Sequence, residues 1–199
     1  MNKVIFDPIQ HKYFDEEGHE RKSVTWLLNH FGMTPDYEKF GNDTARDFGT
    51  AVHKVCELYD KGELSKYKYD LNLEPWLNGY KKFLKEFRPK WNVIEEPLIS
   101  KVWGFSGTPD RAGIIRSIQW EIDLKTGTED ASHQLQTAGY EILIEENLKI
   151  KIKKRASLYL MPDDFRLVEH KNRSDRSVFI GLAQAFNWKK NHNLIGAEK

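Results

Sequence analysis

The chain has 199 residues, of which 39% are hydrophobic, and its 31 Lys and Arg nearly balance 30 Asp and Glu. This size and apolar content predict a single α/β domain over residues 1–199, because the chain contains no repeat, low-complexity segment or Pro/Gly/Ser-rich linker. No apolar run approaches the roughly 20 residues that cross a bilayer, and the first residues lack a signal-peptide core. We therefore expect a soluble, cytoplasmic protein that does not enter a membrane.

Residues 1–40 are predicted to elaborate a core formed by residues 41–199. They contain a hairpin-like segment over 13–19, followed by a helix that begins around Val24. The core begins with a longer helix, capped by Asn42 or Asp43 and closed at Gly62. The predicted apolar side of this helix consists of Phe48, Val52, Val55, Cys56 and Tyr59.

One stripe of this helix carries Gly49, His53 and Glu57, which are spaced at i, i+4 and i+8. The glycine permits close approach of another segment, and the imidazole beside it could supply a nitrogen ligand to a metal ion. The alternative is a structural or solvated histidine, which is the commoner case on helices. Glu57 is assigned to an ion pair with Lys61 and left out of the site.

The next segments predict structure rather than chemistry. Residues 74–87 form an amphipathic pattern that predicts a helix ending before Pro89. Residues 91–105 predict an extended strand interrupted at Pro97. Glu95 and Glu96 lie on this strand, and we assign neither a catalytic part.

Residues 111–125 predict an antiparallel hairpin that turns at Arg116 and Ser117. Apolar and polar residues alternate along its second strand, so that one face carries Gln119, Glu121, Asp123 and Lys125. Asp123 and Lys125 are then neighbours, about 6.6 Å apart along the strand. Hairpin pairing can bring Asp110 alongside them.

Asp110, Asp123 and Lys125 suit phosphodiester hydrolysis. Mg²⁺ is usually held by one or two carboxylates together with waters and substrate phosphate. A lysine beside it can orient the attacking water or offset charge that develops on the phosphate. The alternative is a surface strand whose charges serve solubility and edge protection. Glu121 is assigned to a position behind the ligands or in solvent.

Residues 130–144 predict a second long helix, capped by Asp130 or Ser132, on which Gln136 and Tyr140 share a face. An amide and a phenol at this spacing can reach a phosphate oxygen or each other. The alternative is a packed tyrosine with a hydrated hydroxyl. Short strands around 158–160 and 165–168 and a closing helix over 177–188 complete a predicted mixed sheet flanked by helices.

Positive charge is concentrated towards the end of the chain. Residues 149–199 carry 12 Lys and Arg against 5 Asp and Glu, a balance of +7, whereas residues 1–148 carry 19 against 25, a balance of −6. Such basic groups could track phosphates without reading sequence. The alternative is a strand edge protected from aggregation by lysines. The groups concerned are Lys149, Lys151, Lys153, Lys154, Arg155, Lys171, Arg173 and Arg176.

Four motifs in order, Gly49-x-x-x-His53, Gly107-Thr-Pro-Asp110, Asp123-Leu-Lys125 and Gln136-x-x-x-Tyr140, resemble RecB-type nucleases of the PD-(D/E)XK superfamily. The resemblance covers roughly residues 45–145, and the hairpin-like start followed by Val24-Thr-Trp is similar to small phage-encoded members. It implies a PD-(D/E)XK core. Several relatives hold an iron–sulfur cluster with four cysteines, which a chain with Cys56 alone cannot build.

The resemblance also implies an activity, a metal and a partner. Mg²⁺, for which Mn²⁺ can substitute, would be held by His53, Asp110, Asp123 and the backbone carbonyl of Leu124. Lys125 would be catalytic with Asp110 and Asp123, while Gln136 and Tyr140 would complete the catalytic set and hold DNA. The expected activity is that of an exonuclease acting on linear DNA with free ends in recombination, repair or phage DNA processing, within the host cytoplasm if phage-encoded.

Three points stay open from the sequence. An endonuclease that nicks or resolves branched DNA is the nearest enzymatic alternative. A non-catalytic DNA-binding subunit that retains the nuclease fold is the alternative from another class. Some relatives assemble into rings, so a homo-oligomer or a recombination or replication partner protein belongs to the same set of expectations.

Overall fold

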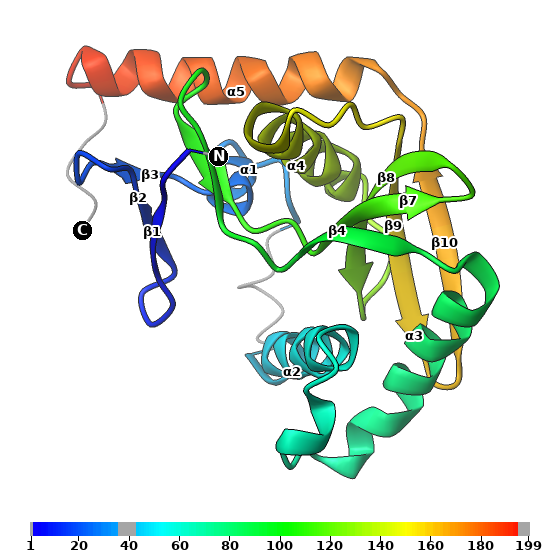
Figure 1. Cartoon of the computed structure of the whole chain (residues 1–199). Helices are drawn as coiled ribbons and strands as arrows, with labels where there is room; N and C mark the ends of the chain where they lie inside the picture. The colour runs from blue at the N-terminus through cyan, green and yellow to red at the C-terminus, as the bar shows by residue number, and fades with distance from the viewer. Residues whose placement is uncertain (1, 36–42, 195–199) are drawn as a thin grey trace.

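A five-stranded mixed sheet forms the centre of the protein in the computed structural model, which describes residues 2–35 and 43–194 (Figure 1). The strand order is β10-β9-β8-β7-β4, and only the β8–β9 pair is parallel. The strands are β4 (Lys90–Ile94), β7 (Arg111–Ile115), β8 (Ile118–Lys125), β9 (Lys154–Met161) and β10 (Asp164–His170). The prediction of an α/β fold with a central mixed sheet flanked by helices is confirmed.

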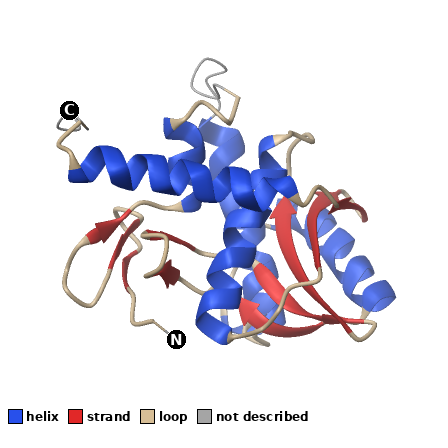
Figure 2. Ribbon diagram, turned by 90° about the horizontal axis from the view of Figure 1, so that it is seen from above, coloured by secondary structure: helices blue, strands red, loops and turns tan. Residues whose placement is uncertain are grey.

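Helices cover both faces of this sheet (Figures 1 and 2). Ile122 and Leu124 of β8 pack in one apolar cluster with α2 (Asp43–Asp60) and α3 (Glu74–Phe87). Ala112 of β7 belongs to a second cluster with α1 (Val24–His30), α4 (Ser132–Leu148) and α5 (Ser174–Asn191). None of the described helices combines the length and apolar character needed to cross a membrane.

Smaller elements surround this core. One three-stranded sheet contains β1 (Ile5–Asp7), β2 (Lys12–Phe14) and β3 (Glu20–Arg21), and one two-stranded sheet contains β5 (Leu98–Ser100) and β6 (Phe105–Gly107). Two short 3₁₀ helices, η2 (Leu64–Lys66) and η3 (Leu71–Leu73), connect α2 to α3. Val24 and Leu28 of α1 pack in the same apolar cluster as α4 and α5. The division into an elaboration over 1–40 and a nuclease core over 41–199 stays a prediction.

The predicted hairpin is confirmed as β7 and β8. Arg116 and Ser117 have φ values of 48° and 66°, the conformation of a tight two-residue turn whose twist matches that of the flanking strands. The pairing runs from Ile115 opposite Ile118 to Arg111 opposite Ile122, and β8 then continues to Lys125. Asp110 therefore lies beside a stretch of β8 that β7 no longer covers.

Two predicted elements differ in their limits, and one residue differs in its exposure. The strand expected over 91–105 divides into β4 and β5, which belong to different sheets. The closing helix begins at Ser174 rather than Ser177. Tyr59, expected on the apolar side of α2, is 38% exposed, because it lies in the last turn, whereas Cys56 is fully buried as expected. The predicted cap at Asn42 lies outside the described residues.

Candidate metal centre

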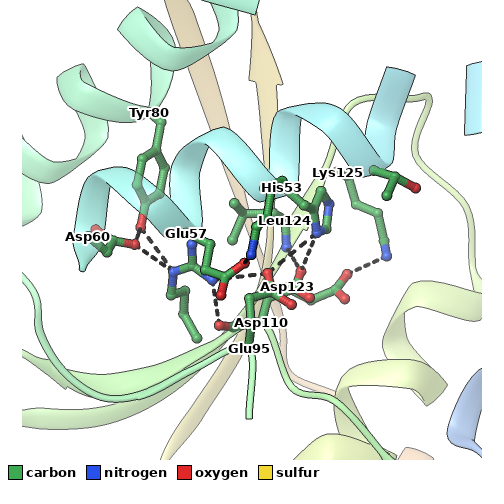
Figure 3. A network of polar contacts seen from close by, with 12 residues as sticks. His53, Glu57, Asp60, Tyr80, Glu95, Asp110, Asp123, Leu124 and Lys125 are labelled. Atoms are coloured by element: carbon green, nitrogen blue, oxygen red, sulfur yellow. Dashed lines mark hydrogen bonds and ion pairs between the residues drawn. The ribbon is translucent and has the colours of Figure 1, made fainter. Parts of the chain in front are cut away.

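The first group of the site joins α2 to the end of β4 and the start of β7. His53 Nδ1 lies 3.5 Å from Asp110 Oδ2 and 3.7 Å from Glu95 Oε1. Ligand atoms of these three residues all lie within 4.8 Å of one another (Figure 3). A nitrogen and two carboxylate oxygens at this separation can hold a divalent cation.

Gly49 explains how α2 approaches the sheet closely enough. A β-carbon at this position would lie 3.1 Å from the Thr126 hydroxyl, just past the end of β8. The absent side chain therefore brings His53, one helical turn further on, to the uncovered end of β8. Glu57 pairs with Lys54 and Lys61 at 2.8 and 2.6 Å, as predicted for the Lys61 pair.

Asp110 is fixed by the backbone of the neighbouring strand. Its Oδ2 accepts a hydrogen bond of 2.6 Å from the Leu124 N–H. In a strand, the N–H and C=O of one residue point towards the same edge. The Leu124 carbonyl is therefore directed towards the edge that carries Asp110, and its role as a metal ligand stays a prediction.

Asp123 and Lys125 form the second group, and α4 holds it. Lys125 Nζ lies 2.7 Å from Asp123 Oδ2 and donates to Gln136 Oε1 at 2.9 Å. Gln136 Nε2 in turn donates to the Tyr140 hydroxyl at 3.1 Å. The predicted site residues of β8 and α4 are thus connected in one chain of contacts.

Charges within the site alter the ionisation of its members. Burial raises the pKa of Asp123 to about 6, assisted by Asp110 and opposed by Lys125. Burial by itself would lower the pKa of His53, but Asp110 and Glu95 outweigh it and raise that pKa to about 10. Burial would likewise lower the pKa of Lys125, but Asp123 and Asp110 outweigh it and raise that pKa. Within this site, the carboxyl groups of Glu95, Asp110 and Asp123 therefore outnumber the cationic side chains of His53 and Lys125.

Of the two positions expected for Glu121, behind the ligands or in solvent, the structure excludes the second. The residue is fully buried, because α4 covers the polar face of β8. Within the described residues neither of its oxygens has a hydrogen-bond partner. Burial, followed by the nearby Asp123, holds the pKa of Glu121 well above its ordinary range.

Glu95 is the residue that the sequence reasoning missed. It was assigned no catalytic part, yet it lies beside His53 and Asp110. The reason is tertiary: antiparallel pairing of β4 with β7 places Ile94 opposite Arg111, and the Glu95 N–H bonds to the Asp110 carbonyl at 2.9 Å. Only that long-range register would have indicated Glu95.

Arg111 connects this edge of the site to the core. Its side chain is fully buried and bonds Asp60 Oδ2 at 2.7 Å and Glu95 Oε1 at 3.1 Å. Tyr80 donates a second hydrogen bond to Asp60 at 2.6 Å (Figure 3). A buried guanidinium needs such partners, since leaving it unpaired would be strongly destabilising.

The basic residues predicted to track phosphates separate into two sets, apart from Lys149, which donates to the Glu146 carbonyl at 2.8 Å. Arg155 is buried against Glu141 and Asp175, at 3.1 and 3.0 Å, and is therefore structural, contrary to the prediction. Lys151, Lys154 and Arg176 also pair with glutamates. Three exposed residues line a hollow of about 510 Å³ between β9, β10 and α5, namely Lys153, Lys171 and Arg173.

Comparisons with known proteins found distant structural neighbours and no related sequence family. No family model and no curated protein matches the chain. A crystal structure from Eubacterium rectale, provisionally named an exonuclease, aligns at a TM-score of 0.48 and 11% identity over 74% of this chain and 69% of that one. The protein SSO0001 aligns at a TM-score of 0.37 and 19% identity over 75% of this chain and 77% of that one. Both scores are too low to carry an argument about function.

Proposed function

We propose that this protein is a divalent-metal-dependent deoxyribonuclease with a PD-(D/E)XK, RecB-like core. One observation carries the proposal: His53, Asp110, Asp123 and Lys125, which come from motifs spread over the chain, converge at the uncovered end of β8. Clusters of buried, mutually perturbed ionisable groups are typical of functional sites. The proposed substrate is DNA.

The residues present fit a hard divalent cation. Carboxylate oxygens and an imidazole nitrogen are available, and the acidic groups exceed the cations that face them. We propose Mg²⁺, with Mn²⁺ able to substitute, held by His53, Asp110, Asp123 and the Leu124 carbonyl. When bound, such an ion supplies Lewis acidity that polarises a phosphodiester and favours water as the nucleophile.

Lys125 is proposed as the catalytic cation. Asp123 and Gln136 restrict its ammonium to one place, and Asp123 and Asp110 keep it protonated. An ammonium held there can orient the attacking water and offset charge on the phosphate without reorganising during the reaction. Preorganisation of the ammonium is the role that we propose for the contacts of Asp123 and Gln136 with Lys125.

Gln136 and Tyr140 are proposed to contact the DNA backbone. The Tyr140 hydroxyl accepts from Gln136, so its own hydrogen remains for a phosphate oxygen. A β-carbon at Gly107 would lie 3.0 Å from the Tyr140 ring, which explains how α4 packs directly over the segment leading to Asp110. Such contacts position DNA without reading its sequence.

Action on DNA ends is proposed on the family resemblance of the motifs alone. The same holds for a role in recombination, repair or phage DNA processing in the cytoplasm, and for a homo-oligomer or a recombination or replication partner protein. The endonuclease and the non-catalytic subunit are the alternatives that the test must exclude.

The deciding experiment compares linear with covalently closed circular DNA in the presence of Mg²⁺. We expect linear DNA to be degraded, closed circles to persist, and Asp123→Asn to be inactive on both while still binding DNA. Efficient cutting of closed circles would favour the endonuclease. Equal, negligible cleavage by wild type and Asp123→Asn over several metals would favour the non-catalytic subunit.

A further inference from the structure

Glu95 has a backbone conformation that is unusual for its residue type. Its φ of 47° lies in the left-handed region, which is unfavourable for a residue with a side chain. Such conformations persist only where the surrounding structure holds them, and they cluster at active sites and ligand clamps. The position of Glu95 therefore calls for a physical reason.

The carboxyl group of Glu95 is held next to that of Asp110. The hydrogen bond from the Glu95 N–H to the Asp110 carbonyl continues the β4–β7 pairing by one step beyond Ile94 and Arg111. Like charges at opposed positions of paired strands are destabilising. The two carboxyl groups together favour a cation between them.

Arg111 fixes the orientation of Glu95. One nitrogen, Nη1, donates to Glu95 Oε1 at 3.1 Å and to the Asp110 carbonyl at 2.6 Å. The guanidinium cannot move, because its Nε is bonded to Asp60 inside the core. Within the described residues no hydrogen bond involves the other oxygen of Glu95, Oε2, which leaves a carboxylate lone pair for a ligand.

Building on the proposed nuclease function, we infer that Glu95 is a further carboxylate ligand of the divalent ion, beside His53 and Asp110. Arg111 is its positioning residue, since it contacts Glu95 and is itself withdrawn from the site. The ligand set proposed above, which omits Glu95, is then incomplete. The rival role for Glu95 is that of a counter-ion for Arg111 alone.

The test measures Mn²⁺ binding to the DNA-free protein by the paramagnetic resonance signal of free Mn²⁺, so it does not depend on catalysis. Glu95→Gln keeps the size of the side chain and is expected to weaken binding about 10- to 100-fold. Glu96→Gln is the matched control, because this neighbouring carboxyl group is outside the cluster, and its affinity should stay within about twofold of wild type. Asp123→Asn serves as the variant that lacks a proposed ligand.

A second variant separates lost folding from lost binding. Asn tolerates the left-handed region, so Glu95→Asn should retain cooperative thermal unfolding while losing Mn²⁺ affinity to the same degree as Glu95→Gln. The inference is overturned if both Glu95 variants bind Mn²⁺ like wild type while Asp123→Asn does not. Failure of wild type itself to bind Mn²⁺ or Mg²⁺ would instead overturn the proposed metal chemistry, and this inference with it.

Discussion

The Leu124 N–H and the Asp110 carboxylate are joined by a hydrogen bond of 2.6 Å at the point where β7 ceases to pair with β8. One oxygen of Asp110 is thereby used by the backbone, and the orientation of the whole carboxyl group is set. The same bond closes the edge of β8 that the missing strand pairing leaves open. Structure and proposed chemistry therefore depend on a single side chain, and substitutions can separate the two.

Asp110→Asn is expected to abolish activity with little effect on folding. The amide oxygen of Asn can still accept from the Leu124 N–H, whereas the negative charge is lost. We expect cleavage of linear DNA to fall on the order of 10³-fold. Asp110→Ala should in addition lower the free energy of unfolding by about 1–3 kcal/mol, because the Leu124 N–H loses its partner. Urea unfolding and cleavage measured on the same preparations check both. Equal unfolding free energies for the two variants would contradict this account.

Lys125→Met is expected to separate catalysis from metal binding. The ammonium is lost, so cleavage should fall about 10²- to 10⁴-fold, the range for a positioned proton-transfer or charge-stabilising group. Metal affinity should be retained, because Lys125 competes with a cation for Asp123 rather than binding it. Mn²⁺ titration and single-turnover cleavage provide the two readouts. A loss of Mn²⁺ binding as large as that of Asp123→Asn would show that Lys125 maintains the site instead.

The sequence predicts those parts of the site that depend on local order. The turn at Arg116 and Ser117 and the alternation along β8 suffice to place Asp123 next to Lys125, and helical spacing suffices for Gln136 next to Tyr140. Glu95 could not be predicted, because it depends on the register between β4 and β7, which are separated in the chain by β5 and β6 of another sheet.

The strand pattern also does not predict which polar residues are buried. The alternation predicts a polar face for β8, yet whether water or a helix covers that face depends on where α4 lies. Glu121 is buried for this reason, and burial raises its pKa. Arg155 is likewise buried, because Glu141 from α4 and Asp175 from α5 enclose it. In both cases partners distant in sequence decide the outcome.

Acid should destabilise the protein through two buried histidines. His133 bonds the Tyr159 hydroxyl at 2.7 Å and His170 bonds Ser157 Oγ at 2.9 Å. Burial, assisted by Lys125 for His133 and by Arg155 for His170, lowers both pKa values from 6.5 to about 4. The unfolded chain then binds more protons between about pH 4 and 6.5, so stability is lost as the pH falls through this window.

At about 1.4 kcal/mol per pKa unit, the fall from 6.5 to about 4 corresponds to roughly 3.4 kcal/mol for each imidazole. Solvent screening of these partly accessible groups reduces the expected loss to the order of 2 kcal/mol. Urea unfolding at several pH values measures it. His170→Gln, whose amide can still reach Ser157, should show a shallower decline between pH 6.5 and 4 than wild type. The free energy of unfolding of each protein at pH 7.5 is the reference from which its decline is measured. Parallel declines would exclude His170 as a source of the acid sensitivity.

DNA affinity should depend on salt through the exposed lysines of the hollow between β9 and β10. Lys153 and Lys171 line it with exposed side chains and no ion pair among the described residues, unlike the paired Lys151 and Lys154. If each contacts one phosphate, Lys153→Glu with Lys171→Glu should make the slope of log K against log salt shallower by about 1–2 units. Fluorescence anisotropy with a labelled linear duplex measures this slope.

A charge-matched control comes from the opposite side of the sheet. Lys68→Glu with Lys85→Glu changes the net charge by the same amount at two exposed positions near and on α3. A long-range effect of net charge would shift the slope equally in both double variants, whereas direct phosphate contact predicts a change in the first alone. Equal slopes for all three proteins would assign these lysines to the alternative role of protecting a strand edge, because charges that leave DNA binding unchanged release no counterions from it.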